Sequence, residues 1–200
     1  GYQQDSENGV VTFEFGIQNH VLTSLSTIEG AWENKEKLIA YQKSFYKDAV
    51  ELAKKEKFDG YLLHEKHDSY RLNALLDKLN EHKIKVYPLT ADYSHNKENF
   101  EKENTYFVPL AQPQYRLIQT LFAELTNFQD NTFYDVSGWT MPLAMDIDFY
   151  QVTQSRKLKV AKTAWEKPVK KSIVNNNVAT TPYAYAFTWD NFLAPKLLNK

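Results

Sequence analysis

A strand–helix–strand pattern between residues 60 and 89 constrains the fold more than any other feature of this chain. Gly60–His64 is a short apolar run typical of a buried strand. Asp68 or Ser69 can cap the next helix, whose leucines recur at three- and four-residue steps. Residues 84–89 predict a second strand. Together they imply two parallel strands joined by a right-handed crossover.

Further elements are expected on both sides of this unit. Residues 10–15 alternate, with Val11, Phe13 and Phe15 on one face, and predict a strand. Residues 18–27 are a polar arm, and a long helix is expected over residues 31–55. The remaining expectations are a polar loop at 92–104, strands at 106–110, 147–152 and 183–189, and helices after Gln112-Pro113 and over 191–198.

These elements predict an α/β fold, a three-layer α/β/α arrangement with a mostly parallel sheet. We expect an N-terminal strand and arm at residues 1–27, followed by an α/β domain at residues 28–200. We interpret the last strand and helix of that domain as the truncated start of a larger one. The start of the chain at Gly1 has no signal-peptide pattern, and we interpret the chain as a piece of a longer protein.

Composition excludes several functional classes. The 200 residues carry a net charge of −1, which argues against nucleic-acid binding because phosphates require a surplus of Lys and Arg. There are no cysteines, so disulfides, thiolate nucleophiles and cysteine-based zinc sites are all excluded. No apolar run is long enough to predict a membrane span.

Histidines are the first candidates for a metal site. His64 and His67 lie at the carboxyl end of a predicted strand, where ligand sites of α/β proteins occur. Their spacing of three residues departs from the helical zinc motif, which needs two His four apart, so a solvated loop is the favoured interpretation. His95 and Glu98 have the His-x-x-Glu spacing of carboxypeptidase zinc ligands, but no second His follows in the sequence.

Three other positions could carry chemistry. Glu14 lies between apolar neighbours on the predicted first strand, yet no zinc ligands can be assembled around it, and a solvent-facing Glu is favoured. Ser137-Gly138-Trp139 lacks the flanking pattern of a nucleophile turn. Trp139 and Tyr134 could line a pocket, although core packing is the stronger expectation. We therefore assign no catalytic, cofactor-binding or metal-binding residue.

Several spaced segments resemble one family. They are residues 8–13 (NGVVTF), 19–27 (NHVLTSLST), 30–31, 38–46 (LIAYQKSFY), 106–113 (YFVPLAQP) and 134–143 (YDVSGWTMPL). In this order they resemble the region just after the catalytic core of bacterial zinc carboxypeptidase-like proteins, the carboxypeptidase A-type metallopeptidases of Bacteroidetes. Residues 183–189 look like the opening strand of the class-I glutamine amidotransferase-like domain that follows there. The resemblance implies an amidotransferase-like or flavodoxin-like fold.

The same resemblance implies a function for the chain. The family's zinc ligands and catalytic Glu lie upstream of the matching segments, and its amidotransferase chemistry uses a Cys that this chain lacks. The chain is therefore expected to be a non-catalytic accessory domain that packs beside the parent's catalytic domain and the following domain. Zinc is expected only in the parent. The parent is expected to be exported to the periplasm or the cell exterior.

Two alternatives from other classes stay open. One is a free-standing module whose aromatic-rich face, with Trp139, binds a glycan or peptide. The other is a small metal-dependent hydrolase that uses His64, His67 and a nearby carboxylate. Stoichiometric zinc in the purified chain would favour the second alternative.

Overall fold

A computed structural model describes residues 3–7, 9–95, 98–124, 140–168, 184, 186–187 and 189–199. The chain divides into two compact units, Gly1–Lys47 and Asp48–Lys200. Helix α2 spans the division between them. Among the described residues, no helix combines the length and the apolar character needed to cross a membrane.

The first unit consists of a β-hairpin followed by helical segments. Strands β1 (Gln3–Ser6) and β2 (Gly9–Thr12) pair antiparallel, and α1 (Phe13–Glu33) begins directly after β2. Thr12 caps α1, because its side chain accepts a hydrogen bond from the backbone amide of Phe15. Helix α2 (Lys35–Ala53) follows after the single residue Asn34. No residue of α1 is buried.

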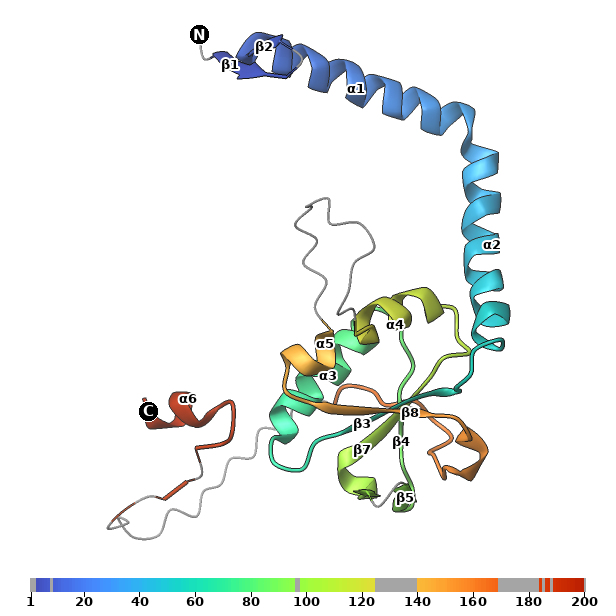
Figure 1. The fold of residues 1–200 in the computed structure, drawn as a ribbon, viewed down its shortest axis with the longest axis vertical. Coiled ribbons are helices and arrows are strands. Elements are labelled where there is room, and N and C mark those ends of the chain that lie inside the picture. The colour runs from blue at the N-terminus through green and yellow to red at the C-terminus, as the bar shows by residue number, and fades with distance from the viewer. Residues whose placement is uncertain are drawn as a thin grey trace. The chain divides into compact units, whose positions relative to one another are not determined.

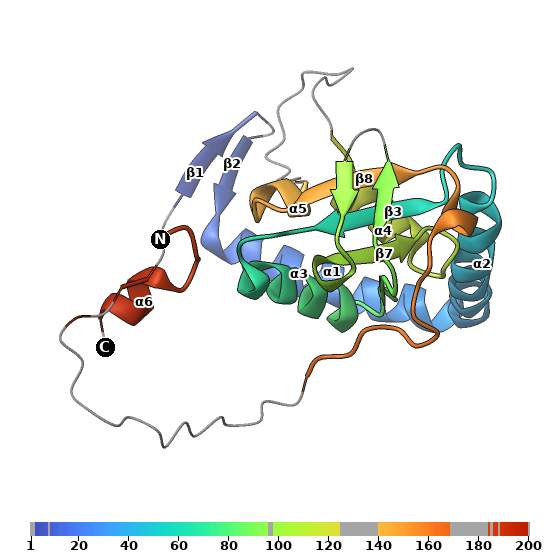
Figure 2. The same ribbon diagram turned by 90° about the horizontal axis from the view of Figure 1, so that it is seen from below.

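The second unit is built on a four-stranded sheet (Figures 1 and 2). The strands are β3 (Gly60–His64), β4 (Tyr87–Pro88), β7 (Thr105–Pro109) and β8 (Asp148–Val152), in the order β4-β7-β3-β8. Every pair of neighbours is antiparallel. A separate hairpin joins β5 (Tyr93–His95) to β6 (Glu98–Phe100).

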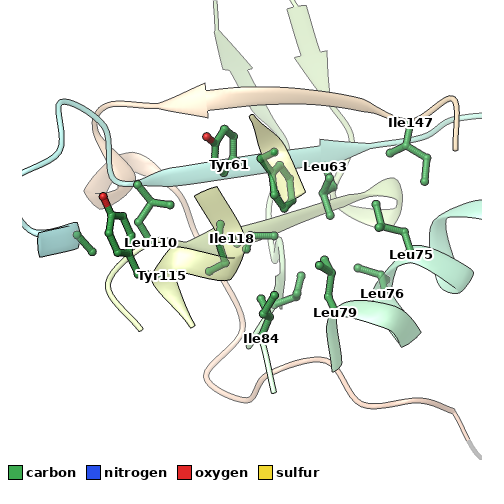
Figure 3. Close-up of a cluster of buried hydrophobic side chains, with 14 of the residues drawn as sticks. Tyr61, Leu63, Leu75, Leu76, Leu79, Ile84, Leu110, Tyr115, Ile118 and Ile147 are labelled. Atoms are coloured by element: carbon green, nitrogen blue, oxygen red, sulfur yellow. The ribbon is translucent and has the colours of Figure 1, made fainter. Parts of the chain in front are cut away.

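Helices α3 (Ser69–Glu81), α4 (Tyr115–Phe122) and α5 (Met141–Ala144) lie on one side of this sheet (Figure 1). The main core forms between them and the sheet, where Leu75, Leu76 and Leu79 of α3 pack near Leu63 of β3 and Ile118 of α4 (Figure 3). These five side chains are fully buried. Burial of a Leu or Ile side chain contributes about 1.5–3 kcal/mol to stability, so this layer holds α3 and α4 on the sheet.

The opposite face of the sheet carries a smaller apolar cluster. Leu62 of β3 and Phe107 of β7 are buried there with Phe100 of β6, and Tyr150 packs against them. Two short 3₁₀ turns, η1 (Lys102–Asn104) and η2 (Ser155–Lys157), precede β7 and follow β8. Helix α6 (Ala194–Leu198) is the last described element.

The predicted mostly parallel, three-layer α/β/α fold is wrong. β3 and β4 do run in the same direction, but β7 lies between them and pairs antiparallel with both. The strand–helix–strand unit is therefore split, and its two strands share no hydrogen bonds. The described sheets are all antiparallel and are associated with α-helices, an α+β arrangement. An amidotransferase-like or flavodoxin-like sheet is thereby overturned for the described residues.

Two local expectations are also corrected. Phe13 and Phe15 lie in the first turn of α1 rather than on a strand, because the cap at Thr12 starts the helix there. The predicted loop at 92–104 contains β5, β6 and η1, and it buries Phe100 against the sheet. Of residues 183–189, the described ones (184, 186, 187 and 189) lie outside any strand.

Candidate functional site

A polar pocket of about 290 Å³ lies at the carboxyl end of β3. Its lining comprises His64, Glu65, Lys66, His67, Arg71, Glu98, Asp146, Asp148 and Tyr150. The sheet register explains part of this set, because His64 pairs with Thr105 of β7 on one side and with Asp148 of β8 on the other. The pocket brings together His64, His67 and Glu98, which are three of the candidates expected from sequence.

His64 is the most enclosed of these side chains, with 5% of its surface exposed. Its Nδ1 atom lies 2.8 Å from Oγ1 of Thr105, and its ring meets that of Phe100 edge to face. Its buried Nε2 atom has no hydrogen-bond partner in the part of the chain that the structure describes. Burial lowers the pKa of His64, and the charge of Lys66 lowers it further. The imidazole is therefore neutral at pH 7.

Glu65 and Asp68 are held in place by backbone amides. Glu65 accepts hydrogen bonds from the amides of His67 (2.7 Å) and Asp68 (3.0 Å), which shapes the turn after β3. Asp68 is fully buried and caps α3 through the amides of Tyr70 (3.0 Å) and Arg71 (3.1 Å). Burial acts to raise the pKa of Asp68, but the hydrogen bonds from backbone amides outweigh it and lower the pKa.

Arg71 closes one wall of the pocket. Its Nη1 atom donates to Asp146 at 2.5 Å, and its Nη2 atom lies 3.7 Å from Glu65. Its Nε atom is 3.2 Å from Asp68, outside the geometry of a hydrogen bond. The hydrogen bond to Asp146 and the surrounding carboxylates raise the pKa of Arg71. This guanidinium therefore neutralises the acidic groups on its own side of the pocket.

Glu98 and Asp148 also line the pocket, and both interact electrostatically with Tyr150. Neither carboxylate has a basic side chain within ion-pair distance among the described residues. Burial raises the pKa of the Tyr150 hydroxyl, and the negative charges of Asp148 and Glu98 add to this increase. Two carboxylates without counter-ions among the described residues therefore lie near the Tyr150 hydroxyl. Asp148 and Tyr150 were not singled out by the sequence, although both lie on the correctly expected strand at 147–152.

The other sequence candidates lie apart. His95 lines a second pocket of about 110 Å³ on the same sheet face, where its ring stacks on Tyr93. Glu14 is exposed in the first turn of α1 and accepts a hydrogen bond from Gln18, so its expected place on a strand is wrong. Tyr134 and residues 137–139 lie outside the described residues. Within the described ranges, no three His, Asp or Glu side chains are grouped to hold a metal ion.

No protein-family model, curated protein or solved structure matches this chain. The resemblance to zinc carboxypeptidase-like proteins therefore rests on the sequence segments alone and stays a prediction.

Proposed function

We propose that this chain is a non-catalytic accessory domain of a zinc carboxypeptidase-like protein, and that its polar pocket binds a cationic group such as the amino terminus of a peptide. The observation that carries the ligand class is the pair of carboxylates, Glu98 and Asp148, which line the pocket without a basic partner among the described residues. The parent family and its exported location come from the sequence resemblance.

The charges of the pocket favour a cation. Four carboxylates line it against one Lys and one Arg, and Arg71 is already engaged with Asp146 and Glu65. Glu98 and Asp148 are left to attract an ammonium group. Tyr150 also lines the pocket, and a cation over an aromatic ring gains about 0.5–2 kcal/mol. Neutral His64 adds no positive charge that would oppose binding of a cation.

The hydrogen bonds made by the other polar side chains near the pocket support an accessory role. Oε1 of Glu65 and both oxygens of Asp68 accept hydrogen bonds from backbone amides, which hold the turn after β3 and the first turn of α3. An activated nucleophile or a general base needs a reacting partner within hydrogen-bond reach, and among the described residues the side-chain partner of His64 is Thr105. Binding, rather than bond cleavage, is the chemistry that this arrangement suits.

The ligand class is tested by calorimetric titration of the chain with trialanine and with N-acetyl-trialanine. We expect binding of the free amine only, and loss of that binding in Asp148→Asn. Glu103→Gln changes an exposed carboxylate outside the pocket and is the matched control, which should bind as wild type does. Equal binding of both peptides, or no effect of Asp148→Asn, would contradict a cation site.

The accessory role is tested by the zinc content and carboxypeptidase activity of the chain purified without chelator. We expect no bound zinc and no release of carboxyl-terminal residues from peptides. One zinc per chain, abolished by His64→Ala or His67→Ala, would replace the accessory role with a metal-dependent hydrolase.

A further inference from the structure

Helix α1 presents an apolar stripe that is exposed along its whole length. The stripe repeats at steps of three and four residues, which places its members on one side of the helix. Its members are Phe13, Ile17, Val21, Leu25, Ile28 and Trp32, and each has at least half of its surface exposed. An amphipathic helix takes most of its stability from packing of its apolar face, so this stripe requires a partner.

The charge on α1 is opposite to the charge on the segment that follows it. Phe13–Glu33 contains three Glu and no Lys or Arg. Residues 35–47, the start of α2, contain four Lys and one Glu. This segment also exposes apolar side chains, including Leu38, Ile39 and Tyr41. The acidic helix and the basic segment therefore have complementary charges, and both have exposed apolar side chains that can pack together.

Within a single chain, α1 and α2 cannot cover each other's exposed apolar side chains. Only Asn34 separates them, whereas an antiparallel helix pair needs a connection of about 2–5 residues. Helical hydrogen bonds also run across this position, from the amide of Asn34 to Gly30 (3.1 Å) and from the amide of Leu38 to Asn34 (2.9 Å). The chain therefore cannot fold back on itself here.

We propose that two copies of this chain associate through residues 13–47, with α1 of each copy packed antiparallel on residues 35–47 of the other. A two-fold axis near Gly30, the midpoint of residues 13–47, makes the contact reciprocal, as in most homodimers. The antiparallel direction places the acidic half of each copy opposite the basic half of its partner. A parallel pair would place like charges together, which is destabilising. This contact uses the first unit and is independent of the pocket.

The test is sedimentation equilibrium of the full 200-residue chain over two decades of concentration. We expect a monomer–dimer equilibrium that Leu25→Asp and Ile28→Asp shift to monomer. Leu143→Asp, an equally exposed leucine on α5, is the matched control and should leave the dimer unchanged. Circular dichroism and a native urea midpoint establish that each variant is folded. A chain that stays monomeric throughout, including one that binds lipid vesicles or another protein instead, would overturn the proposal.

Charge exchange tests the direction of the contact. One variant carries Glu14→Lys, Glu29→Lys and Glu33→Lys, and a second carries Lys35→Glu, Lys37→Glu and Lys43→Glu. Each variant alone should dimerise at least about tenfold more weakly, because α1 then repels its partner segment. An equimolar mixture should recover the dimer, since both contacts become complementary again. Recovery would be strongest at low ionic strength. A mixture as weak as its components would overturn the antiparallel arrangement.

Discussion

The Nδ1 atom of His64 lies 2.8 Å from Oγ1 of Thr105, and both residues are buried where β3 meets β7. This contact orients the imidazole toward the interior at the end of the central strand. It also leaves Nε2 enclosed without a partner among the described residues. His64 and Thr105 therefore affect both the stability of this end of the sheet and the charge of the pocket.

The lowered pKa of His64 makes stability depend on pH in a defined window. The folded pKa lies below the unfolded value of about 6.5, so the unfolded chain binds the proton more tightly. The contribution is fully present above that unfolded value and is lost as the pH falls through the folded pKa. Urea unfolding between neutral and acidic pH should show this decrease. The decrease should be smaller in His64→Gln, with exposed His82→Gln as the control; equal pH profiles for all three proteins would refute it.

Removal of the hydroxyl partner should destabilise the fold without altering its shape. Thr105→Val keeps the side-chain volume but leaves the buried Nδ1 of His64 without a partner, at a cost of about 1–3 kcal/mol. Thr105→Ser retains the hydroxyl and should lose less. The measurement is the free energy of unfolding from urea titration. A valine variant as stable as wild type would mean that the hydroxyl contributes nothing to this end of the sheet.

Asp68 ties the start of α3 to the carboxyl-terminal segment. It caps α3 and also accepts a hydrogen bond from the backbone amide of Phe192 at 2.6 Å. Asp68→Ala should lower the free energy of unfolding by about 2–4 kcal/mol, because it removes these bonds and leaves part-buried amides unpaired. Hydrogen exchange should then increase at Phe192 as well as in α3. Ser69→Ala, at the neighbouring exposed position, serves as control, and unchanged exchange at Phe192 would argue against the tie.

Because the pKa of Asp68 is lowered in the folded protein, its contribution to stability also depends on pH. It is present above the unfolded pKa of about 3.9 and is lost as the pH falls through the folded pKa. The difference in unfolding free energy between wild type and Asp68→Ala should therefore shrink under strongly acidic conditions. Acid titration followed by circular dichroism measures it. A difference that stays constant below the unfolded pKa would contradict a charge-dependent role.

The sequence predicts the features of this molecule that depend on residues close together in the chain, and it misses those that depend on residues far apart. Helix α3 was predicted with its buried leucines and with a cap at Asp68 or Ser69, because both signals are local, and the structure shows that Asp68 is the cap. The insertion of β7 between β3 and β4 was missed, since a pairing such as Leu62 with Phe107 leaves no local trace. For the same reason, His64 was found as a candidate but its neighbours Thr105 and Asp148 were not. They meet only after the sheet has formed.

Gly60 is the position where the sheet tolerates no side chain. It lies in the central strand β3, paired with Pro109 on one side and Val152 on the other. A Cβ atom there would stand 2.3 Å from the carbonyl oxygen of Val108 and 2.6 Å from the ring of Phe107. The carbonyl cannot withdraw, because β7 is bonded to β3 and β4 on its two edges. Gly60→Ala should therefore destabilise the protein by at least about 1–3 kcal/mol.

Gly16→Ala provides the matched control for this substitution. Gly16 lies in α1, and a Cβ atom there meets nothing within 4 Å. Alanine is the better helix former by about 1 kcal/mol, so this variant should be as stable as wild type or more stable. Urea unfolding of both variants, followed by circular dichroism, compares them directly. Equal midpoints for the two would show that β3 and β7 can separate enough to admit a methyl group, and that the close approach at Gly60 is not a requirement of the sheet.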